Sequence, residues 1–214
     1  MKIRNIVMLA AVALSSAACC NQKCDQACAQ DAQVCVDKGQ TVIETIMTRR
    51  SVRKYTAQPV SRDTLMTIAK CGINAPNGMN RQPWEVRILD DKATIDSLTA
   101  IFKAKEPRFA QDSTMVNMFR NAPAVIFVAA IDGAQLDCGI LGENMALAAW
   151  GMGLGSCFLG GPIAFLKNTP EMKPFLDKLD LSPNAELVYA LGVGYPDETP
   201  EAKPRDESKI KFVE

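Results

Sequence analysis

The chain has 214 residues, with 24 basic side chains, 24 acidic side chains and no histidine. Because the charge is balanced, the sequence offers no basic surface for nucleic acid, and we expect no nucleic-acid partner. The lack of histidine excludes Ser-His-Asp and Cys-His catalysis and histidine-based zinc sites. Apolar residues make up 48% of the chain, which is typical of a globular protein that can form one domain with a sizeable core.

The first 18 residues are predicted to be a secretory signal peptide. Lys2 and Arg4 precede an apolar run over residues 6–18 that is too short to span a bilayer. The sequence Ser16-Ala17-Ala18-Cys19 resembles the lipobox of bacterial lipoproteins, although that motif favours Leu where Ser16 stands. We therefore expect an exported lipoprotein, attached to a membrane through a lipid on Cys19 and facing the periplasm or the cell surface. The alternative is cleavage after Ala18 and a soluble periplasmic protein.

Residues 19–40 are predicted to be a flexible, cysteine-rich tether. Cys20, Cys24 and Cys28 recur every four residues, which would place three thiols on one face of a helix. This spacing matches no common iron–sulfur pattern, so we expect no metal site. Cys19 and Cys35 complete the cluster. In an oxidising compartment, these cysteines are better explained as disulfide-bonded or acylated than as metal ligands.

Residues 41–214 are expected to form one α+β domain, because the pattern contains no internal repeat and no interior linker. A short apolar stripe predicts a helix over 41–49, and Ser61 is a candidate N-cap for a helix that extends to about Asn74. A strand is predicted over 84–89. Helices are predicted over 93–102 and 108–120, with an interruption at Pro107, and a buried strand over 124–131.

The longest predicted helix covers residues 135–150 and is apolar on most of its surface, which is typical of a helix buried in a protein or against a second copy. Strands are predicted over 156–159 and 186–193, with one or two short helices among the prolines of 162–183. Trp84, Cys71, Cys138 and Cys157 are predicted to lie in the core, and Tyr55 to pack against it.

Four segments carry the candidate chemistry. The first, Arg49-Arg50-Ser51-Val52-Arg53-Lys54-Tyr55, places three guanidinium groups and a hydroxyl directly after a helix. This set suits a phosphate, although composition by itself favours a solvated basic turn. The second, residues 75–84 with the sequence A-P-N-G-M-N-R-Q-P-W, predicts an ordered turn with exposed backbone groups ahead of a strand.

The third segment is the glycine-rich stretch 151–161. Its glycines follow a helix, so it is not a dinucleotide-binding fingerprint, which requires a strand, then glycines, then a helix. Glycines here allow the backbone to pass close to a flat group. The fourth segment is L-G-V-G-Y-P-D over 191–197, followed by Lys203-Pro204-Arg205, a second pair of cations after a buried strand.

In this order, the four segments resemble the nitroreductase family of FMN enzymes, and the resemblance extends from about Val42 to the C-terminus. The most specific parts are R-R-S-V-R-K-Y, A-P-N-G-M-N-R-Q-P-W and L-G-V-G-Y-P-D with the later K-P-R. The helix containing residues 144–149 also resembles the central helix of the family. The resemblance implies a nitroreductase-like α+β fold, with a central antiparallel-rich sheet flanked by helices, in an obligate domain-sharing homodimer.

The resemblance also implies roles for individual residues. Arg49 would hold the FMN phosphate, Ser51 would lie near the ribityl–phosphate, and Arg50 would contact the phosphate or the ribityl chain. Arg53 would approach the pyrimidine edge of the flavin, where many relatives have Lys. A fixed cation there favours reduction, because the reduced flavin carries negative charge at N1.

The remaining residues implied by the resemblance lie on three other segments. Lys203 and Arg205 match a late basic pair that closes on the same phosphate. The loop that reaches the flavin of the other subunit matches Pro76, Asn77, Gly78 and Asn80. The backbone that passes the flavin N5 matches Gly160 and Gly161, although some relatives place a glutamate at the position of Gly160.

The implied activity is hydride transfer by a ping-pong mechanism, from a reduced donor such as NAD(P)H to a nitroaromatic, quinone or similar small acceptor. No side chain is expected to act as a catalytic acid or base, because the flavin carries the chemistry. Two alternatives remain open: a flavin-dependent dehalogenase, thiazoline-type oxidase or cofactor-modifying enzyme of the same fold, and a lipid-tethered binding protein with a vestigial flavin site. The short segment 103–120, the candidate cover for a substrate, favours a plain reductase. Export conflicts with NAD(P)H as donor, since NAD(P)H is cytoplasmic.

Overall fold

The computed structural model describes residues 40–213, so the predicted signal peptide and the cysteines of the tether lie outside the described residues. The chain divides into two units after Glu44, and the fold and site below belong to the unit that begins at Thr45. Residues 40–48 are helical, close to the predicted range of 41–49. None of the described helices is long and apolar enough to cross a membrane.

Within the described residues, one sheet of four antiparallel strands forms the centre of the fold, in the order β1-β2-β4-β3. The strands are β1 (Trp84–Leu89), β2 (Ala124–Ile131), β3 (Gly155–Leu159) and β4 (Ala185–Gly194). β2 is buried from Ala124 to Ala130, because helices cover both faces of the sheet. The predicted α+β class with an antiparallel-rich sheet is confirmed.

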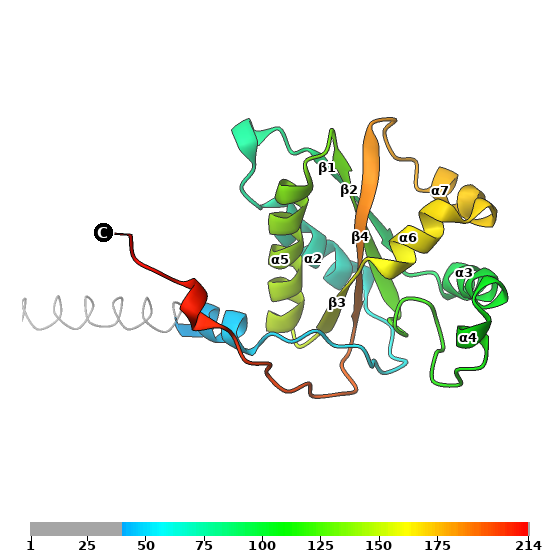
Figure 1. Cartoon of the computed structure of the whole chain (residues 1–214), viewed down its shortest axis with the longest axis horizontal. Helices are drawn as coiled ribbons and strands as arrows, with labels where there is room; N and C mark the ends of the chain where they lie inside the picture. The colour runs from blue at the N-terminus through cyan, green and yellow to red at the C-terminus, as the bar shows by residue number, and fades with distance from the viewer. Residues whose placement is uncertain (1–39, 214) are drawn as a thin grey trace, which may run out of the picture. The chain divides into compact units, whose positions relative to one another are not determined.

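Figure 1 shows the two helical layers. Alternate residues of β2 face opposite layers: Ile126 and Val128 pack with α2 (Arg62–Ile73) and α5 (Gln135–Gly151). On the other face, Val125 and Phe127 pack with α3 (Lys92–Lys105), α6 (Gly161–Asn168) and α7 (Lys173–Lys178). The short helices η2 (Pro170–Met172) and η3 (Glu207–Lys209) complete the C-terminal half.

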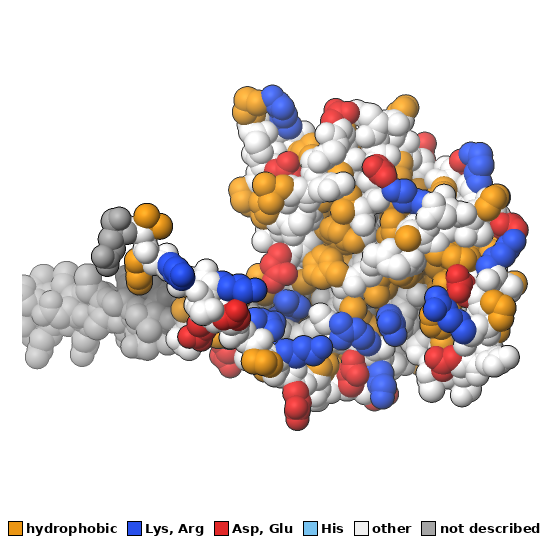
Figure 2. All heavy atoms as spheres, viewed as in Figure 1, with side chains coloured by type: hydrophobic (Ala, Val, Ile, Leu, Met, Phe, Trp, Pro, Cys, Tyr) orange, Lys and Arg blue, Asp and Glu red, His pale blue; other side chains and the backbone are white. Residues whose placement is uncertain are grey.

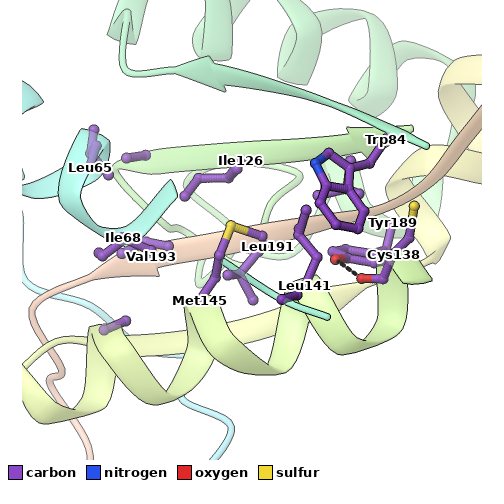
Figure 3. Packing of buried hydrophobic residues seen from close by; sticks show 14 of the residues in the cluster. Leu65, Ile68, Trp84, Ile126, Cys138, Leu141, Met145, Tyr189, Leu191 and Val193 are labelled. Atoms are coloured by element: carbon purple, nitrogen blue, oxygen red, sulfur yellow. Dashed lines mark hydrogen bonds between the residues drawn. The ribbon is translucent and has the colours of Figure 1, made fainter. Parts of the chain in front are cut away.

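The layer formed by α2 and α5 is built as the local sequence predicts. The side chain of Ser61 caps α2 by accepting from the backbone N–H of Thr64 at 3.1 Å. Gly72 allows α2 to approach α5 closely, because a Cβ there would lie 2.5 Å from Cγ of Met145. Figure 3 shows Met145 facing Leu191 of β4. α5 therefore lies directly on the sheet.

Two predictions about local structure are wrong. The helix predicted over 108–120 is limited to one turn, α4 (Pro107–Ala110). Beyond it, Asn121 Oδ1 accepts from the backbone N–H groups of Val116 and Asn117 at 2.8 and 3.0 Å, and such side-chain bonds compete with helix formation. Cys71 is exposed rather than buried, because the neighbouring Gly72 takes the position on α2 that faces α5. Trp84, Cys138 and Cys157 are buried, as predicted.

Candidate functional site

The basic segment 49–56 begins as an extended chain against β3. The backbone N–H of Val52 donates to the carbonyl of Ser156 at 2.9 Å, and Ser51 forms a parallel bridge with Ser156. The side chain of Val52 is fully buried, and a Cβ on Gly155 would lie 2.7 Å from its Cβ. Because alternate residues of an extended chain point to opposite sides, Ser51 and Arg53 point away from the core.

The same segment is held on its other side by the chain that follows β4. The backbone N–H of Thr56 donates to the carbonyl of Tyr195 at 2.9 Å, and that of Asp197 donates to the carbonyl of Lys54 at 3.0 Å. Tyr55 forms an antiparallel bridge with Pro196. The first and fourth sequence segments, far apart in the chain, therefore meet at one end of the sheet.

Tyr55 anchors this junction. Its hydroxyl donates to the carbonyl of Val52 at 2.5 Å and lies 3.4 Å from the carbonyl of Gly192. Burial raises the pKa of the Tyr55 phenol above its ordinary value, and the nearby Cys157 and Glu198 add to the rise. The phenol therefore stays neutral and remains a donor. A Cβ on Gly194 would lie 2.8 Å from Cδ1 of Tyr55, so the ring packs against the end of β4, as predicted.

Arg49, the first residue of this segment, faces α5. Its Nε is 3.3 Å from Oε1 of Glu143, which is close enough for an ion pair. The orientation gives no hydrogen bond, however, and this buried Nε has no hydrogen-bond partner among the described residues. A buried, charged N–H without a partner is costly, so this group is suited to an external anion.

The other two arginines of the segment make backbone contacts. Nη1 of Arg50 donates to the carbonyls of Met47 and Arg49, both at 2.8 Å, and so closes the C-terminal end of the helix over 40–48. The exposed Arg53 donates from Nη1 to the carbonyl of Ser51 at 3.2 Å. Figure 2 shows basic side chains gathered below the sheet, in the region where this segment runs.

The late basic pair lies on the irregular tail that follows β4. Lys203 and Arg205 are both exposed, and Nη1 of Arg205 donates to the carbonyl of Lys203 at 3.1 Å. The tail leaves the sheet where Tyr195 and Asp197 pair with the basic segment. No hydrogen bond or ion pair among the described residues joins this pair to Arg49.

Gly160 and Gly161 lie where β3 ends and α6 begins. Both are exposed, and a Cβ on either would meet no atom within 4 Å. A cavity of about 680 Å³ includes Gly161 in its lining, and a second of about 530 Å³ includes Gly160. The backbone at this turn is therefore open to a ligand on two sides.

The loop that contains Pro76, Asn77, Gly78 and Asn80 is ordered but lies apart from the basic segment. Oδ1 of Asn77 accepts from the backbone N–H of Gln82 at 2.8 Å. Figure 1 shows η1 (Gly78–Asn80) beyond the N-terminal end of α5, whereas the basic segment passes its C-terminal end. A helix of 17 residues is about 25 Å long, so one chain does not bring both segments to the same small molecule.

Reasoning from the sequence missed two charged residues near this site. Arg120 and Glu198 line a cavity of about 210 Å³ together with Arg53. A glutamate four residues after a buried strand and an arginine in an expected helix carry no local signal of such a role. Within residues 40–213, no group of three or more histidine, cysteine or acidic residues is arranged to hold a metal ion.

Comparisons with known proteins point to one family. The nitroreductase family model matches residues 46–195. The NADPH-flavin oxidoreductase of Vibrio harveyi is 30% identical over 174 residues, which cover 76% of this chain and 69% of that protein. Two crystal structures of nitroreductases with bound FMN, from Bacteroides fragilis and Desulfitobacterium hafniense, each superpose with a TM-score of 0.70 at 26% identity. Each match covers 81% of this chain and 98% of the other.

Proposed function

The chain belongs to the nitroreductase family, and on this premise we propose that it transfers hydride from NAD(P)H to a small nitroaromatic, quinone or similar acceptor. The family makes the chain an FMN-dependent NAD(P)H oxidoreductase in general terms. The acceptor, the order of the two half-reactions and the residues of the site are our proposal.

One observation carries the assignment of the FMN site: the buried Nε of Arg49 that lacks a hydrogen-bond partner among the described residues. A terminal phosphate supplies the hydrogen-bond acceptor that this N–H lacks. We assign Arg49 to that phosphate and Ser51 to the adjoining part of the ribityl chain. Lys203 and Arg205, on the tail that leaves the sheet beside this segment, close on the same phosphate. Arg50, next to Arg49 in the chain, is assigned to the phosphate or the ribityl chain, although its Nη1 already binds the end of a helix.

The flavin ring is assigned to the space between Arg53 and the turn at Gly160 and Gly161. When bound, FMN supplies the site that accepts hydride from the donor and passes it to the acceptor. Arg53 favours the reduced state by placing a cation that is always charged beside the ring. The two glycines leave the backbone open where the donor and then the acceptor approach, as a ping-pong mechanism requires. No side chain is assigned as a catalytic acid or base.

We further propose that two chains build each site. The loop of Pro76, Asn77, Gly78 and Asn80 projects away from the basic segment of its own chain and would reach the flavin of a partner. Met79 in this loop and Leu136 at the start of α5 are both 78% exposed. Burial of such side chains against a second copy stabilises a homodimer.

For the whole chain, we propose a signal peptide over 1–18, a tether over 19–40 and the FMN-binding domain over 41–214. In this arrangement Cys19 carries the lipid, and the enzyme is exported and bound to a membrane. The match to the family begins at residue 46, so the residues assigned to export and attachment, 1–40, lie outside it. The family favours NAD(P)H as the donor, and for an exported enzyme a quinol is the alternative donor outside the cytoplasm.

The first experiment is to purify the protein and identify its flavin. We expect a yellow protein that releases FMN, and release of FAD or a failure to bind FMN on reconstitution would contradict the assignment. Anaerobic addition of NADH, NADPH or a quinol to the bound flavin then identifies the donor. A purified protein that binds no flavin would favour the alternative of a binding protein with a vestigial flavin site.

A further inference from the structure

The cavity beside Gly161 is large enough for a small organic molecule and has a distinct composition. Its volume is about 680 Å³, within the range of ligand pockets. Three phenylalanines line it, and Phe102 contacts the other two, with ring centroids 5.1 Å from that of Phe109 and 4.8 Å from that of Phe165. The side of the cavity formed by α3, α4 and α6 is therefore aromatic and suits a flat apolar ligand.

The charged residues around this cavity are paired, with one exception. Lys105 forms an ion pair with Glu171. Nε of Arg108 lies 3.3 Å from Oε2 of Glu106, and its Cζ lies 4.7 Å from the ring centroid of Phe109. Arg120 has no ion pair or side-chain hydrogen bond within residues 40–213. It is the cation in the described lining whose charge is available to a ligand.

The backbone around Arg120 is held in an unusual conformation. Arg120 has a φ of 57°, in the left-handed region that L-residues other than asparagine and aspartate seldom adopt. Oδ1 of Asn117, a residue only 6% exposed, accepts from the N–H groups on both sides, those of Phe119 at 2.9 Å and Asn121 at 3.1 Å. A conformation that costs energy and is fixed by a buried side chain is characteristic of functional sites.

Arg120 also connects the cavity to the proposed flavin site. It lines the large cavity and the cavity of about 210 Å³ that contains Arg53. Gly161 lies in the lining of the large cavity and in the turn assigned to the hydride-exchanging part of the flavin. A ligand in the large cavity would thus have the turn at Gly161, an aromatic wall and an unpaired guanidinium around it.

We propose that this cavity binds the acceptor, and that Arg120 selects acceptors with an aromatic body and an anionic group such as a carboxylate. The inference rests on the proposed function, because it is Gly161 that connects the cavity to hydride transfer. An unpaired guanidinium can form a bidentate hydrogen-bonded pair with a carboxylate. The aromatic wall can bind the ring of a charged or a neutral acceptor alike. Only the anionic acceptor gains the charged pair with Arg120.

The test compares 4-nitrobenzoate with 4-nitrobenzamide, which have similar size and differ in charge. Calorimetry on the oxidised, FMN-loaded protein gives the Kd of each, and steady-state kinetics give kcat and KM. We expect the wild type to favour the anion by about tenfold or more, the value of one charged hydrogen bond. Arg120→Gln should abolish this preference by raising Kd and KM for the anion, with kcat little changed.

Two matched variants locate the effect at Arg120. Arg120→Lys keeps the charge and should retain part of the preference. Arg108→Gln removes a cation from the same cavity that already has a carboxylate partner, and it should retain the full preference. The preference should also shrink as salt is added, because the charged site is open to solvent.

The proposal is overturned if the wild type binds both compounds equally, if Arg120→Gln keeps the preference, or if Arg108→Gln loses as much of it as Arg120→Gln. FMN content and flavin reduction are measured on the same preparations. A chain that binds no FMN contradicts the proposed function, while calorimetry with 4-nitrobenzoate on that chain still tests the cavity. The two failures are therefore distinguishable.

Discussion

Oε1 of Glu198 accepts two backbone hydrogen bonds, from the N–H of Arg53 at 2.5 Å and from that of Lys54 at 3.2 Å. Glu198 follows β4 and lies 145 residues from Arg53 in the chain. This carboxylate therefore fixes the segment that carries the cation assigned to the flavin ring. Because both bonds end on the same oxygen, a glutamine amide can accept both, whereas alanine accepts neither.

Substitutions of Glu198 should separate position from charge. Glu198→Ala should lower FMN affinity about tenfold, since it removes two hydrogen bonds to a charged acceptor. Glu198→Gln should leave affinity nearly unchanged but raise the flavin reduction potential, because it removes a negative charge near Arg53. Fluorescence titration gives the affinity, and anaerobic titration against a reference dye gives the potential. The exposed Glu201→Ala serves as a control, and identical behaviour of the two Glu198 variants would refute this role.

Arg53 and Arg205 should differ in what they control. Arg53→Ala should lower the flavin reduction potential and slow flavin reduction more than it weakens FMN binding, because Arg53 is assigned to the ring. Arg205→Ala should mainly weaken FMN binding, because Arg205 is assigned to the phosphate. The same two titrations check both variants. Equal losses of affinity with an unchanged potential in both would show that these roles are wrong.

Gly155 is required for packing beneath the basic segment. In Gly155→Ala the new Cβ would come within 2.7 Å of the fully buried Val52. We expect a loss of about 1–3 kcal/mol in the free energy of unfolding, as for other overpacked cores. Gly151→Ala is the matched control, because a Cβ there meets no atom within 4 Å. Urea denaturation measures both, and equal stability of the two variants would contradict the packing described for Gly155.

The three cysteines in the described part of the chain should react differently with iodoacetamide. Burial, with a contribution from Asp137, raises the pKa of the Cys138 thiol from 9.0 to about 11, and burial also raises the pKa of Cys157. Cys71 is exposed. At pH 8, only about one thousandth of Cys138 is then thiolate, the reactive form.

Peptide mapping of the labelled protein should therefore find Cys71 modified first, and the two buried thiols modified only after unfolding in urea. The raised pKa of Cys138 also has a consequence for stability. The folded state keeps a proton that the unfolded state loses, so this contribution is present below pH 9 and is lost as the pH rises toward 11. Rapid labelling of Cys138 at pH 8 in the native protein would be inconsistent with its burial.

Cys19 should control membrane attachment. The wild type should stay with membranes through high-salt washing, because two or more acyl chains hold a protein firmly. Cys19→Ser should abolish lipidation, as measured by mass spectrometry or by incorporation of a labelled fatty acid. Replacement of residues 1–19 by a standard cleavable signal should give a soluble, yellow dimer. If that protein fails to fold or lacks flavin, the early cysteines are structural and the tether assignment is wrong.

Local patterns in the sequence determined most of the secondary structure. The apolar run of β2, the cap at Ser61 and the apolar surface of α5 are properties of neighbouring residues, so each appears in the sequence close to where it acts. The family motifs likewise predicted that the basic segment and the turn at Gly160 and Gly161 belong to the site. The helix expected over 108–120 does not form beyond its first turn. There the side-chain oxygens of Asn117 and Asn121 accept from backbone N–H groups that helical carbonyls would otherwise bind.

Only the tertiary structure decided which of these segments meet. The sequence alone does not show that Glu198 holds the backbone of Arg53. Nor does it show that, among the described residues, Nε of Arg49 has no hydrogen-bond acceptor and Arg120 is the unpaired cation of an aromatic cavity. These relationships join residues that are far apart in the chain. They depend on how the helical layers pack on the sheet, because that packing alone determines which distant side chains share a buried space.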